Sequence, residues 1–560
     1  MEKNKKLIVL GVIALILIVS GITYAILTWT SSRINIGLTS NCFTIDYTKG
    51  QDITNQSIKL INEEDLISDG KFTIKEGIAL TYANIGIKST CNIEGYGILK
   101  LNVTSLSDAF TTGSSKGSLK YAVLKNTSTA STITVASLLN QSFDLVSRGR
   151  ITKLGTIDIL TKQLSNTEIY KYLIVVYIDN SLVSNDVIGS SFAGNISAEA
   201  YQGKLGADYT LQRLNSLNSS IKVDTSKTPD FTTVSGNNGV KYVNDSQTAT
   251  GLGDGTKGIY KAEDDFGTSY YFRGAVDNNY VKFVGYYWRI IRINGDGSIR
   301  MIYDGTIRGS DYNTDFQDNG YVGYMYGNFT TPTNCNTDDN TGVTTCTGGS
   351  TSYEEAHANI NDSGIKAYID YWYNNKLKDY AYAIEDTIYC NDRSITPVDS
   401  FLNIALTGTG KGIENTAYSN LKRNYIDHTP SLKCVNKNDR FTVNNNIGNA
   451  KLTNPIALIT SDEVIMAGAL TYNFIDNSYI RNTDFYLYND NEYWTLTPFA
   501  ALGGVTCVAV VSRGGFLGVG DGGGSSAVRP VVSLKSDAIS GGSGTRNDPW
   551  IVESWAIPLA

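Results

Sequence analysis

A long uncharged apolar run stands near the start of the chain. Residues 7–29, LIVLGVIALILIVSGITYAILTW, carry no charge and follow the mostly basic segment 2–6. About 20 apolar residues suffice to cross a bilayer, and a basic flank stays in the cytoplasm. We expect residues 1–29 to form a cytoplasmic tip and a single transmembrane anchor in the cell membrane, with the C-terminal region extracellular. The alternative is a signal segment, because residues 23–25 (Thr-Tyr-Ala) suit a signal peptidase, and the protein would then be secreted after cleavage.

Short stretches of apolar and polar residues follow from residue 30 to about 203. Turn-forming Gly, Asn, Ser and Asp residues separate them, which is typical of a β-sandwich. Lys171–Ile178 reads KYLIVVYI, as expected of a central strand covered on both faces. The pattern weakens over residues 204–238, which are rich in Ser, Asn, Thr and Gly and therefore predict a linker, with a short helix over Tyr209–Leu217.

Aromatic strands and helices follow from residue 239. The strand Tyr280–Ile293 ends at Asn294–Gly297, a strong hairpin turn. Apolar positions at helical spacing predict a helix over Ser363–Lys378 with a core-packing stripe, and Thr460 or Ser461 is the expected N-cap of another helix. The fold class expected is mainly β with some α. The predicted segments are 1–29 (anchor or signal), 30–203 (β-sandwich), 204–238 (linker), 239–552 (α+β domain) and 553–560 (tail).

Composition narrows the choice of function. The chain is 41% hydrophobic and 18% charged, which is enough apolar material for packed cores. Its 36 Tyr residues favour strands over long helices. The net charge is −7, with no Lys/Arg cluster beyond the N-terminus, so we expect no nucleic-acid partner.

Seven cysteines suit an exported chain, because disulfides persist outside the cytoplasm. Six cysteines allow 15 connectivities, so the sequence leaves the pairing open. Local spacing favours Cys42 with Cys91, Cys335 with Cys346, and Cys390 with Cys434. Cys507 is then left over.

Motif order in the second half of the chain resembles a known fold. The marks are a strand with Trp288-Arg289, two helices, the segment Tyr493–Pro498, and Val528–Val531. This order resembles the formylglycine-generating-enzyme-like (sulfatase-modifying-factor-like) branch of the C-type lectin fold, over about 240–552. The apolar leader followed by a strand-rich domain resembles the TasA/camelysin class of exported matrix proteins.

Some domains of this lectin-type branch are variable proteins of diversity-generating retroelements. Those systems rewrite adenines in Asn-type codons, and the resulting NNY codons cannot encode Lys, Glu, Gln, Met or Trp. Residues 499–527, FAALGGVTCVAVVSRGGFLGVGDGGGSSA, contain none of these five types, and also no Asn or Tyr. The resemblance therefore implies a diversified site at 499–527. The alternative is an ordinary Gly-rich surface loop.

The resemblance implies that this segment presents a ligand-binding surface, because loops on a rigid scaffold carry recognition residues. Phe516 and Arg513 are the strongest candidates, since aromatic and Arg side chains dominate interface energies. We expect Trp494, Arg529 and Pro530 to be the scaffold of the site. The candidate contacts are Val505, Cys507, Ala509, Val511, Arg513, Phe516, Val519 and Asp521.

The sequence offers little catalytic chemistry. It has no HExxH motif and no CxxC motif, so we expect no zinc site, and its two His residues leave few options for a His-dependent triad. Asp264-Asp265 and Asn391-Asp392 could offer oxygen ligands to Ca²⁺, but turn and cap roles are expected there, so we assign no metal ligand. Formylglycine-generating enzymes need two reactive cysteines, whereas Cys507 stands alone in its segment. We therefore predict no enzyme and no cofactor. The function expected is an adhesin-like cell-surface protein for a protein or glycoconjugate ligand; a structural matrix or filament protein and a formylglycine-generating-type enzyme are the alternatives.

Overall fold

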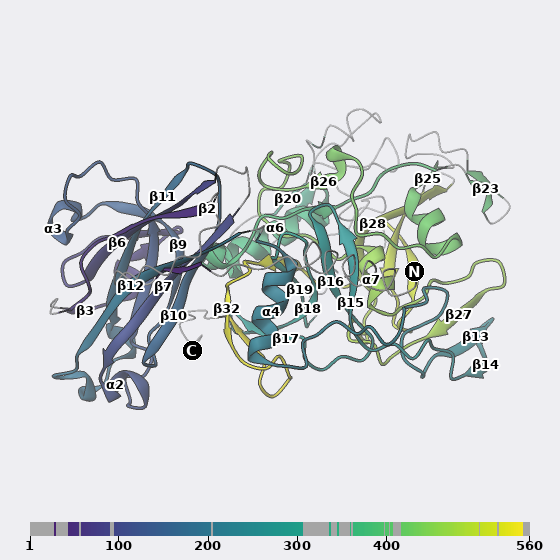
Figure 1. Ribbon diagram of the computed structural model, residues 1–560. Helices are drawn as coiled ribbons and strands as arrows, with labels where there is room; N and C mark the ends of the chain where they lie inside the picture. Colours follow the sequence, from purple (N-terminus) through teal and green to yellow (C-terminus); the bar gives the residue numbers. More distant parts are fainter. Residues whose placement is uncertain are drawn as a thin grey trace, which may run out of the picture. The chain divides into compact units, whose positions relative to one another are not determined.

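The structure is a computed structural model of the 560-residue chain. In Figure 1 the chain is coloured from its N-terminus to its C-terminus. The described residues are 27–29, 43–54, 58–89, 95–202, 205–305, 335–337, 344–346, 359, 362–396, 398–401, 404–406, 416–502, 505–522 and 526–552.

The chain divides into two compact units, Met1–Leu205 and Gly206–Ala560. The predicted linker is therefore corrected, because residues 206–238 belong to the second unit. Helix α4 (Ala207–Leu217) packs there through buried Leu214, and Thr210 Oγ1 donates a 2.6 Å hydrogen bond to the carbonyl of Gly297. A few buried apolar side chains, such as Leu214, pack this segment against the unit. The polar composition of residues 204–238 did not indicate that packing.

Strands dominate the architecture, with 42% of the described residues in strands and 16% in helices, so the described part of the protein is mainly β. The first unit has two sheets. One follows the order β1-β12-β7-β10, formed by Leu27–Trp29, Phe192–Gln202, Gly95–Leu106 and Gly155–Leu164. The other follows β2-β6-β11-β8-β9-β5-β4, formed by Phe43–Lys49, Ala79–Ser89, Ile169–Asp179, Leu119–Lys125, Ser142–Arg150, Lys71–Thr73 and Ile67–Ser68, with β3 (Leu60–Ile61) parallel to β11.

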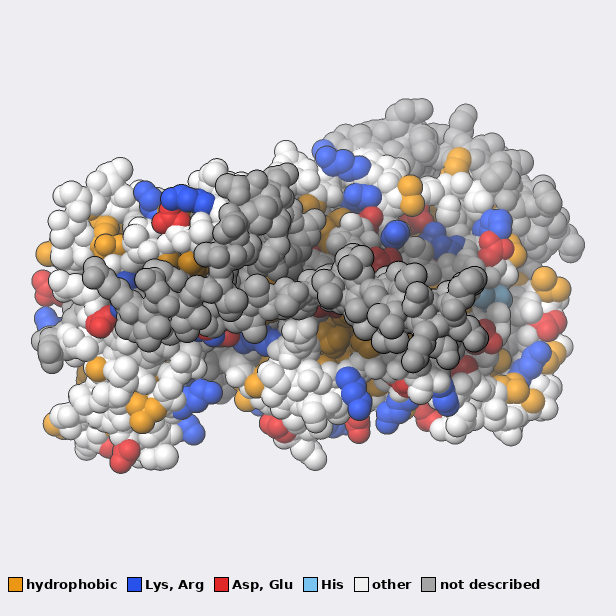
Figure 2. Space-filling view, in the orientation of Figure 1, with side chains coloured by type: hydrophobic (Ala, Val, Ile, Leu, Met, Phe, Trp, Pro, Cys, Tyr) orange, Lys and Arg blue, Asp and Glu red, His pale blue; other side chains and the backbone are white. Residues whose placement is uncertain are grey.

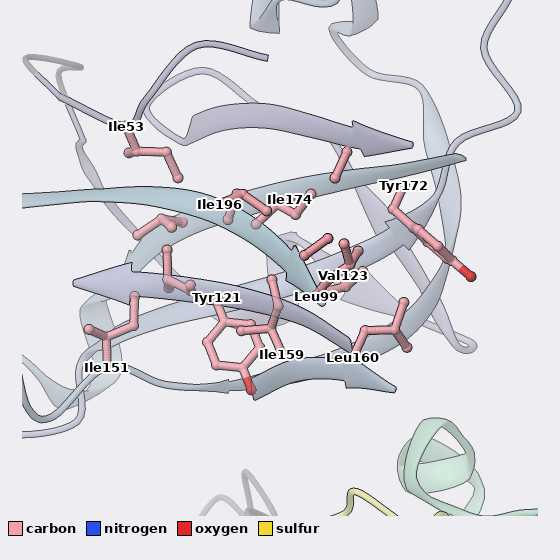
Figure 3. Packing of buried hydrophobic residues seen from close by; sticks show 14 of the residues in the cluster. Ile53, Leu99, Tyr121, Val123, Ile151, Ile159, Leu160, Tyr172, Ile174 and Ile196 are labelled. Carbon is pink, nitrogen blue, oxygen red and sulfur yellow. The ribbon is translucent and has the colours of Figure 1, made fainter. Parts of the chain in front are cut away.

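The two sheets of the first unit share one hydrophobic core. Leu99 of β7 and Ile196 of β12 come from one sheet, and Val123 of β8 and Ile174 of β11 come from the other. Figure 3 shows these side chains lying between the strands. The predicted central strand 171–178 lies within β11, which pairs with β6 on one side and β8 on the other.

The end of the predicted leader has an assigned structure. Leu27–Trp29 forms strand β1, which is antiparallel to β12 with Leu27 opposite Ala200. These three residues were predicted to complete the apolar span, and this is corrected. Residues 1–26 lie outside the described part of the chain. Within the described part, no helix is long and apolar enough to cross a membrane.

The second unit combines several sheets with short helices. Its largest sheet follows the order β15 (Gly258–Asp264), β16 (Gly267–Arg273), β18 (Tyr286–Ile293), β17 (Tyr280–Phe283), β33 (Trp550–Val552) and β32 (Ile539–Gly541). In the same sheet, β19 (Ile299–Tyr303) pairs with β18 and with β31 (Val531–Leu534). Two further sheets follow β25-β28-β29-β30 (Thr416–Ala417, Tyr493–Leu502, Val505–Val511, Leu517–Asp521) and β14-β13-β27 (Ser246–Thr250, Val240–Val243, Ser478–Arg481). The strand pairs are β20-β21 (Cys335–Thr337, Thr344–Cys346), β22-β26 (Tyr389–Cys390, Arg440–Phe441) and β23-β24 (Val398–Phe401, Ile404–Leu406).

Both predicted helices of this unit are present. Helix α6 (Gly364–Lys376) begins after its N-cap Ser363 and buries Ile365, Ile369 and Trp372. Helix α7 (Ser461–Ala467) begins with a capping box between Thr460 and Glu463, because each side chain accepts the other's backbone N–H. Within the described residues, the remaining helical segments are α2 (Asp108–Thr111), α3 (Val135–Leu138), the π-helix η6 (Leu421–Ile426) and the 3-10 turns η1 (Glu63–Asp65), η2 (Asn180–Leu182), η3 (Asn185–Val187), η5 (Lys378–Ala383) and η7 (Lys437–Asp439).

One predicted disulfide is formed, between Cys390 and Cys434. The pairing of β20 with β21 places Cys335 directly opposite Cys346 in the backbone register, and that disulfide stays a prediction. The predicted pair of Cys42 and Cys91 lies outside the described residues.

Candidate ligand-binding surface

The predicted surface loop at 499–527 is mostly strand. It comprises the end of β28, then β29 and β30, joined by a tight turn at residues 512–516. Gly515 has φ +72° in this turn, and a Cβ there would overlap the carbonyl oxygen of Asn482. The segment carries only two charged residues, Arg513 and Asp521, and most of its other residues lie in strands.

The strand register sorts the segment into two faces. Ala509 pairs with Val519 and Cys507 pairs with Asp521, so these four lie on one face. Val510 and its neighbour Gly518 lie on the opposite face. Side chains of paired residues point to the same side, and successive residues alternate.

Trp494 packs against the second of these faces. It pairs with Val510 across β28 and β29, and it is 1% exposed. A Cβ added to Gly520 would lie 2.9 Å from Val510 and 3.0 Å from Trp494. Glycine at 520 therefore makes room for the indole ring, and this face of the sheet is closed to solvent.

Burial separates the candidate contacts into three groups. Ala509 and Val511 are fully buried, so their side chains do not reach a ligand in this conformation, which corrects their assignment as contacts. Cys507 and Val519 are half-buried, as is Phe516, whereas Arg513 and Asp521 are exposed. Val505 lies in β29, and its side chain falls outside the described part of the structure.

Half-buried aromatic rings form a continuous row beside this segment. Tyr242 stacks on Tyr479 at 5.2 Å between ring centroids, and Phe516 lies 4.5 Å from Tyr479. Tyr472 lies 5.9 Å from Phe516, and Phe474 lies 4.9 Å from Tyr472. The aromatic row is defined here as Tyr242, Tyr425, Tyr472, Phe474, Tyr479 and Phe516.

The row is built by segments far apart in the sequence. Tyr242 of β13 and Tyr479 of β27 are a cross-strand pair in the sheet β14-β13-β27, whose strands lie side by side in Figure 1. The backbone N–H of Tyr472 donates to the carbonyl of Leu517, which fixes it beside β30. Tyr425 of η6 packs on Phe474 at 6.3 Å and donates its hydroxyl to the carbonyl of Gly518 at 2.8 Å.

The end of the row near η6 carries exposed aliphatic side chains. Ile475, next to Phe474, is 95% exposed, and Ile426, next to Tyr425, is 48% exposed. Cys507 and Val519 pack against the buried cluster at the same place. Sequence reasoning found Phe516 but missed the other rings of the row. The alternation Tyr472-Asn473-Phe474 is the signal that could have indicated them, because it places two aromatic residues on one side of an extended chain.

The predicted scaffold residues are buried. Arg529, 1% exposed, donates from Nη1 to the carbonyl of Leu487 and from Nε to that of Tyr303, both at 3.0 Å. Its guanidinium also lies over the ring of Tyr493, 4.9 Å from the centroid. The carbonyl of Pro530 accepts the N–H of Tyr303. These bonds tie the end of the 499–527 segment to β19.

The thiol of Cys507 is a poor nucleophile at neutral pH. Burial, with a smaller contribution from the carboxylate of Asp521, raises its pKa to about 11. The thiol therefore stays protonated at neutral pH, whereas a nucleophilic cysteine reacts as the thiolate.

Charged side chains line a polar pocket in the second unit, with Cys390 in its wall. Glu463 accepts from Arg292 Nε and Arg300 Nη1, both at 2.9 Å, and Arg292 also pairs with Asp264 at 2.7 Å. Arg423 holds Asp462 and Asp392 at its rim. These charges satisfy one another, which is typical of a structural ion-pair network. Within the described residues, no group of three or more His, Cys, Asp or Glu side chains could hold a metal ion.

The charges on the surface are mixed. On the face in Figure 2, Lys and Arg side chains alternate with Asp and Glu, and the described residues there form no broad basic area. Comparison of the sequence with protein-family models and with curated proteins gives no match.

Proposed function

We propose that the chain is an exported cell-surface protein that captures a ligand, and that the aromatic row and the turn between β29 and β30 form its binding surface. The observation that carries the proposal is the row itself. Six half-buried aromatic side chains lie in a row on the second unit, and each ring contacts the next one in the row. Amphipathic rings held rigidly at a surface contribute most of the energy at protein interfaces.

The 499–527 segment adds the part of this surface that can vary. Phe516 completes the row, while Arg513, in the turn before β30, and Asp521, the last residue of β30, are exposed. Because one face of the sheet is packed on Trp494, changes at Arg513, Phe516, Val519 and Asp521 alter the surface without entering that interior. This separation suits a site diversified by a retroelement, which is part of the proposal. The proposal assigns no catalytic step.

Paired substitutions test the surface. The double variant Tyr479→Ala/Phe516→Ala should lose capture of the glycans or purified extracellular proteins that the parent chain retains on an immobilised panel. Tyr287→Ala is the matched control, because Tyr287 is 42% exposed on β18 and is no part of the row. Unchanged capture by a folded double variant would place the binding site elsewhere.

The DNA beside the gene tests the diversification separately. We expect a reverse-transcriptase gene and a near-copy of the region that encodes residues 494–530. Absence of both would remove the retroelement from the proposal and leave the binding surface to be judged by the variants.

A further inference from the structure

A buried lysine in the first unit lies between two carboxylates from other elements. Lys120 of β8 is 1% exposed, and the register places it opposite Tyr177 of β11, two residues before Asp179. Its Nζ lies 2.6 Å from Asp179 Oδ2 and 2.5 Å from Glu63 Oε2 of η1. An amine and a carboxyl group are thus held in contact between two neighbouring strands, with a second carboxylate touching the amine.

The outer oxygens of both carboxylates are already held. Asp179 Oδ1 accepts from the backbone N–H of Ser181 at 3.1 Å and from its hydroxyl at 2.8 Å. Glu63 Oε1 accepts from Arg148 at 2.8 Å and from the hydroxyl of Tyr177 at 2.9 Å. The inner oxygens, Asp179 Oδ2 and Glu63 Oε2, therefore stay directed at Lys120 Nζ.

Burial also changes the chemistry of this amine. It lowers the pKa of Lys120 below its usual range, although Glu63 and Asp179 oppose the shift. Lys100 provides the contrast within the same unit. It pairs with Glu199 at 2.8 Å and Asp158 at 3.5 Å, but its side chain is 18% exposed and its pKa is raised, because these partners outweigh a smaller burial. A buried charge is costly, so the Lys120 site favours loss of the charge more than the Lys100 site does.

We propose that Lys120 and Asp179 condense to an intramolecular amide bond, with Glu63 as the proton relay. The Lys120 ammonium gives one proton to Glu63 Oε2, and Glu63 passes it to Asp179 Oδ2. The lone pair of the neutral Nζ then attacks Cγ, and the C=O electron pair moves onto Oδ1. The N–H and hydroxyl of Ser181 stabilise the negative charge there.

Collapse of this intermediate completes the bond. The electron pair returns from Oδ1, the Cγ–Oδ2 bond breaks, and a second proton from Nζ reaches Oδ2 through Glu63. One water leaves, and an N–H remains on the amide. An ammonium and a carboxylate give an amide and water, so the step needs no co-reactant. The link would join β8 covalently to β11, its neighbour in the larger sheet of this unit.

Mass spectrometry of the full chain tests the bond directly. Trypsin does not cleave after an acylated lysine, so the digest should contain residues 117–125 joined to residues 172–204, lighter than the two peptides by one water. Cleavage after Lys100 should be normal in the same digest. Recovery of the folded parent chain with Lys120 cleaved quantitatively, and with residues 172–204 as a separate peptide, would overturn the proposal.

Two variants test the roles within the site. Lys120→Arg keeps a positive charge but lacks the nucleophilic amine, so its intact mass should equal the sequence mass without loss of water. Glu63→Gln keeps the shape and removes the relay, so a Glu63→Gln chain folded by circular dichroism should lack most of the linked peptide. A full yield of the link in folded Glu63→Gln would contradict the role of Glu63, and a link in Lys120→Arg would refute the assignment of Lys120.

Discussion

Within residues 494–529, a few buried side chains stabilise the fold. Trp494 is buried against Val510, and only the absence of a side chain at Gly520 leaves space for its ring. Arg529 satisfies two backbone carbonyls from different segments. These residues lie behind the proposed binding surface, so their loss should lower stability before it affects ligand capture.

We therefore expect Trp494→Ala to lower the free energy of unfolding by about 3–5 kcal/mol, as for other buried tryptophans. Thermal melting of the full chain measures this, with Tyr287→Ala as a control that should stay within about 0.5 kcal/mol, because Tyr287 is a surface residue, 42% exposed. An unchanged melting temperature together with lost ligand capture would show that Trp494 contacts the ligand.

Glu463 makes the second unit sensitive to acid. Burial favours its neutral form, but Arg300 and Arg292 outweigh burial and lower its pKa to about 2. Because the folded pKa lies below the unfolded one, the stabilisation is present above about pH 4.5 and is lost as the pH falls towards 2. Unfolding by urea at a series of pH values should show roughly 3 kcal/mol of this loss for the parent chain. The Glu463→Gln variant should be less stable at neutral pH, and its free energy of unfolding should change less between pH 4.5 and 2. An equally steep fall in the variant would assign the acid sensitivity to other carboxylates.

At the level of elements, the sequence predicted the strongly periodic parts best. The stripe of α6, the cap at Thr460 and the central strand at 171–178 follow from spacing alone, because each pattern reflects one buried face or one cap. The 499–527 segment was assigned to a loop, since a Gly-rich composition with few charges is shared by loops and interior strands. Most of the aromatic row was missed, because its rings come from segments that only the tertiary fold brings together.

The structure predicts opposite outcomes for two sets of changes in β29 and β30. Serine at the open positions, Arg513, Phe516, Val519 and Asp521, should change ligand capture and leave the melting temperature within a few degrees. Asparagine at buried Ala509 and Val511 should cost several kcal/mol, because each places an unsatisfied amide in the core. Circular dichroism melts of the two variants decide this, and unfolding of the serine variant would show that the open positions also belong to the core.

At the scale of the whole molecule, the boundary at residues 205–206 separates two compact units. The first contains the sandwich core and the Lys120 site, and the second contains the aromatic row. The proposed amide bond and the proposed capture of a ligand therefore rest on different units. Either proposal can be wrong while the other holds. Variants at the Lys120 site serve as controls for ligand capture, and variants in the aromatic row serve as controls for the amide bond.

The last prediction concerns the membrane. Strand β1 begins at Leu27, so we expect an anchor within residues 7–26, an uncharged and predominantly apolar stretch of about the length that a bilayer requires. The lysines before this run should keep the N-terminus in the cytoplasm. We expect fractionation to place the protein in the membrane, with residues 30–560 degraded when protease is added to intact cells. Lys-to-Glu changes at positions 3, 5 and 6 should weaken this orientation and protect part of the chain. Release of the protein from cells with a new N-terminus near Ala25 would establish signal cleavage instead, and a protease-resistant protein in the soluble cytoplasmic fraction would refute export altogether.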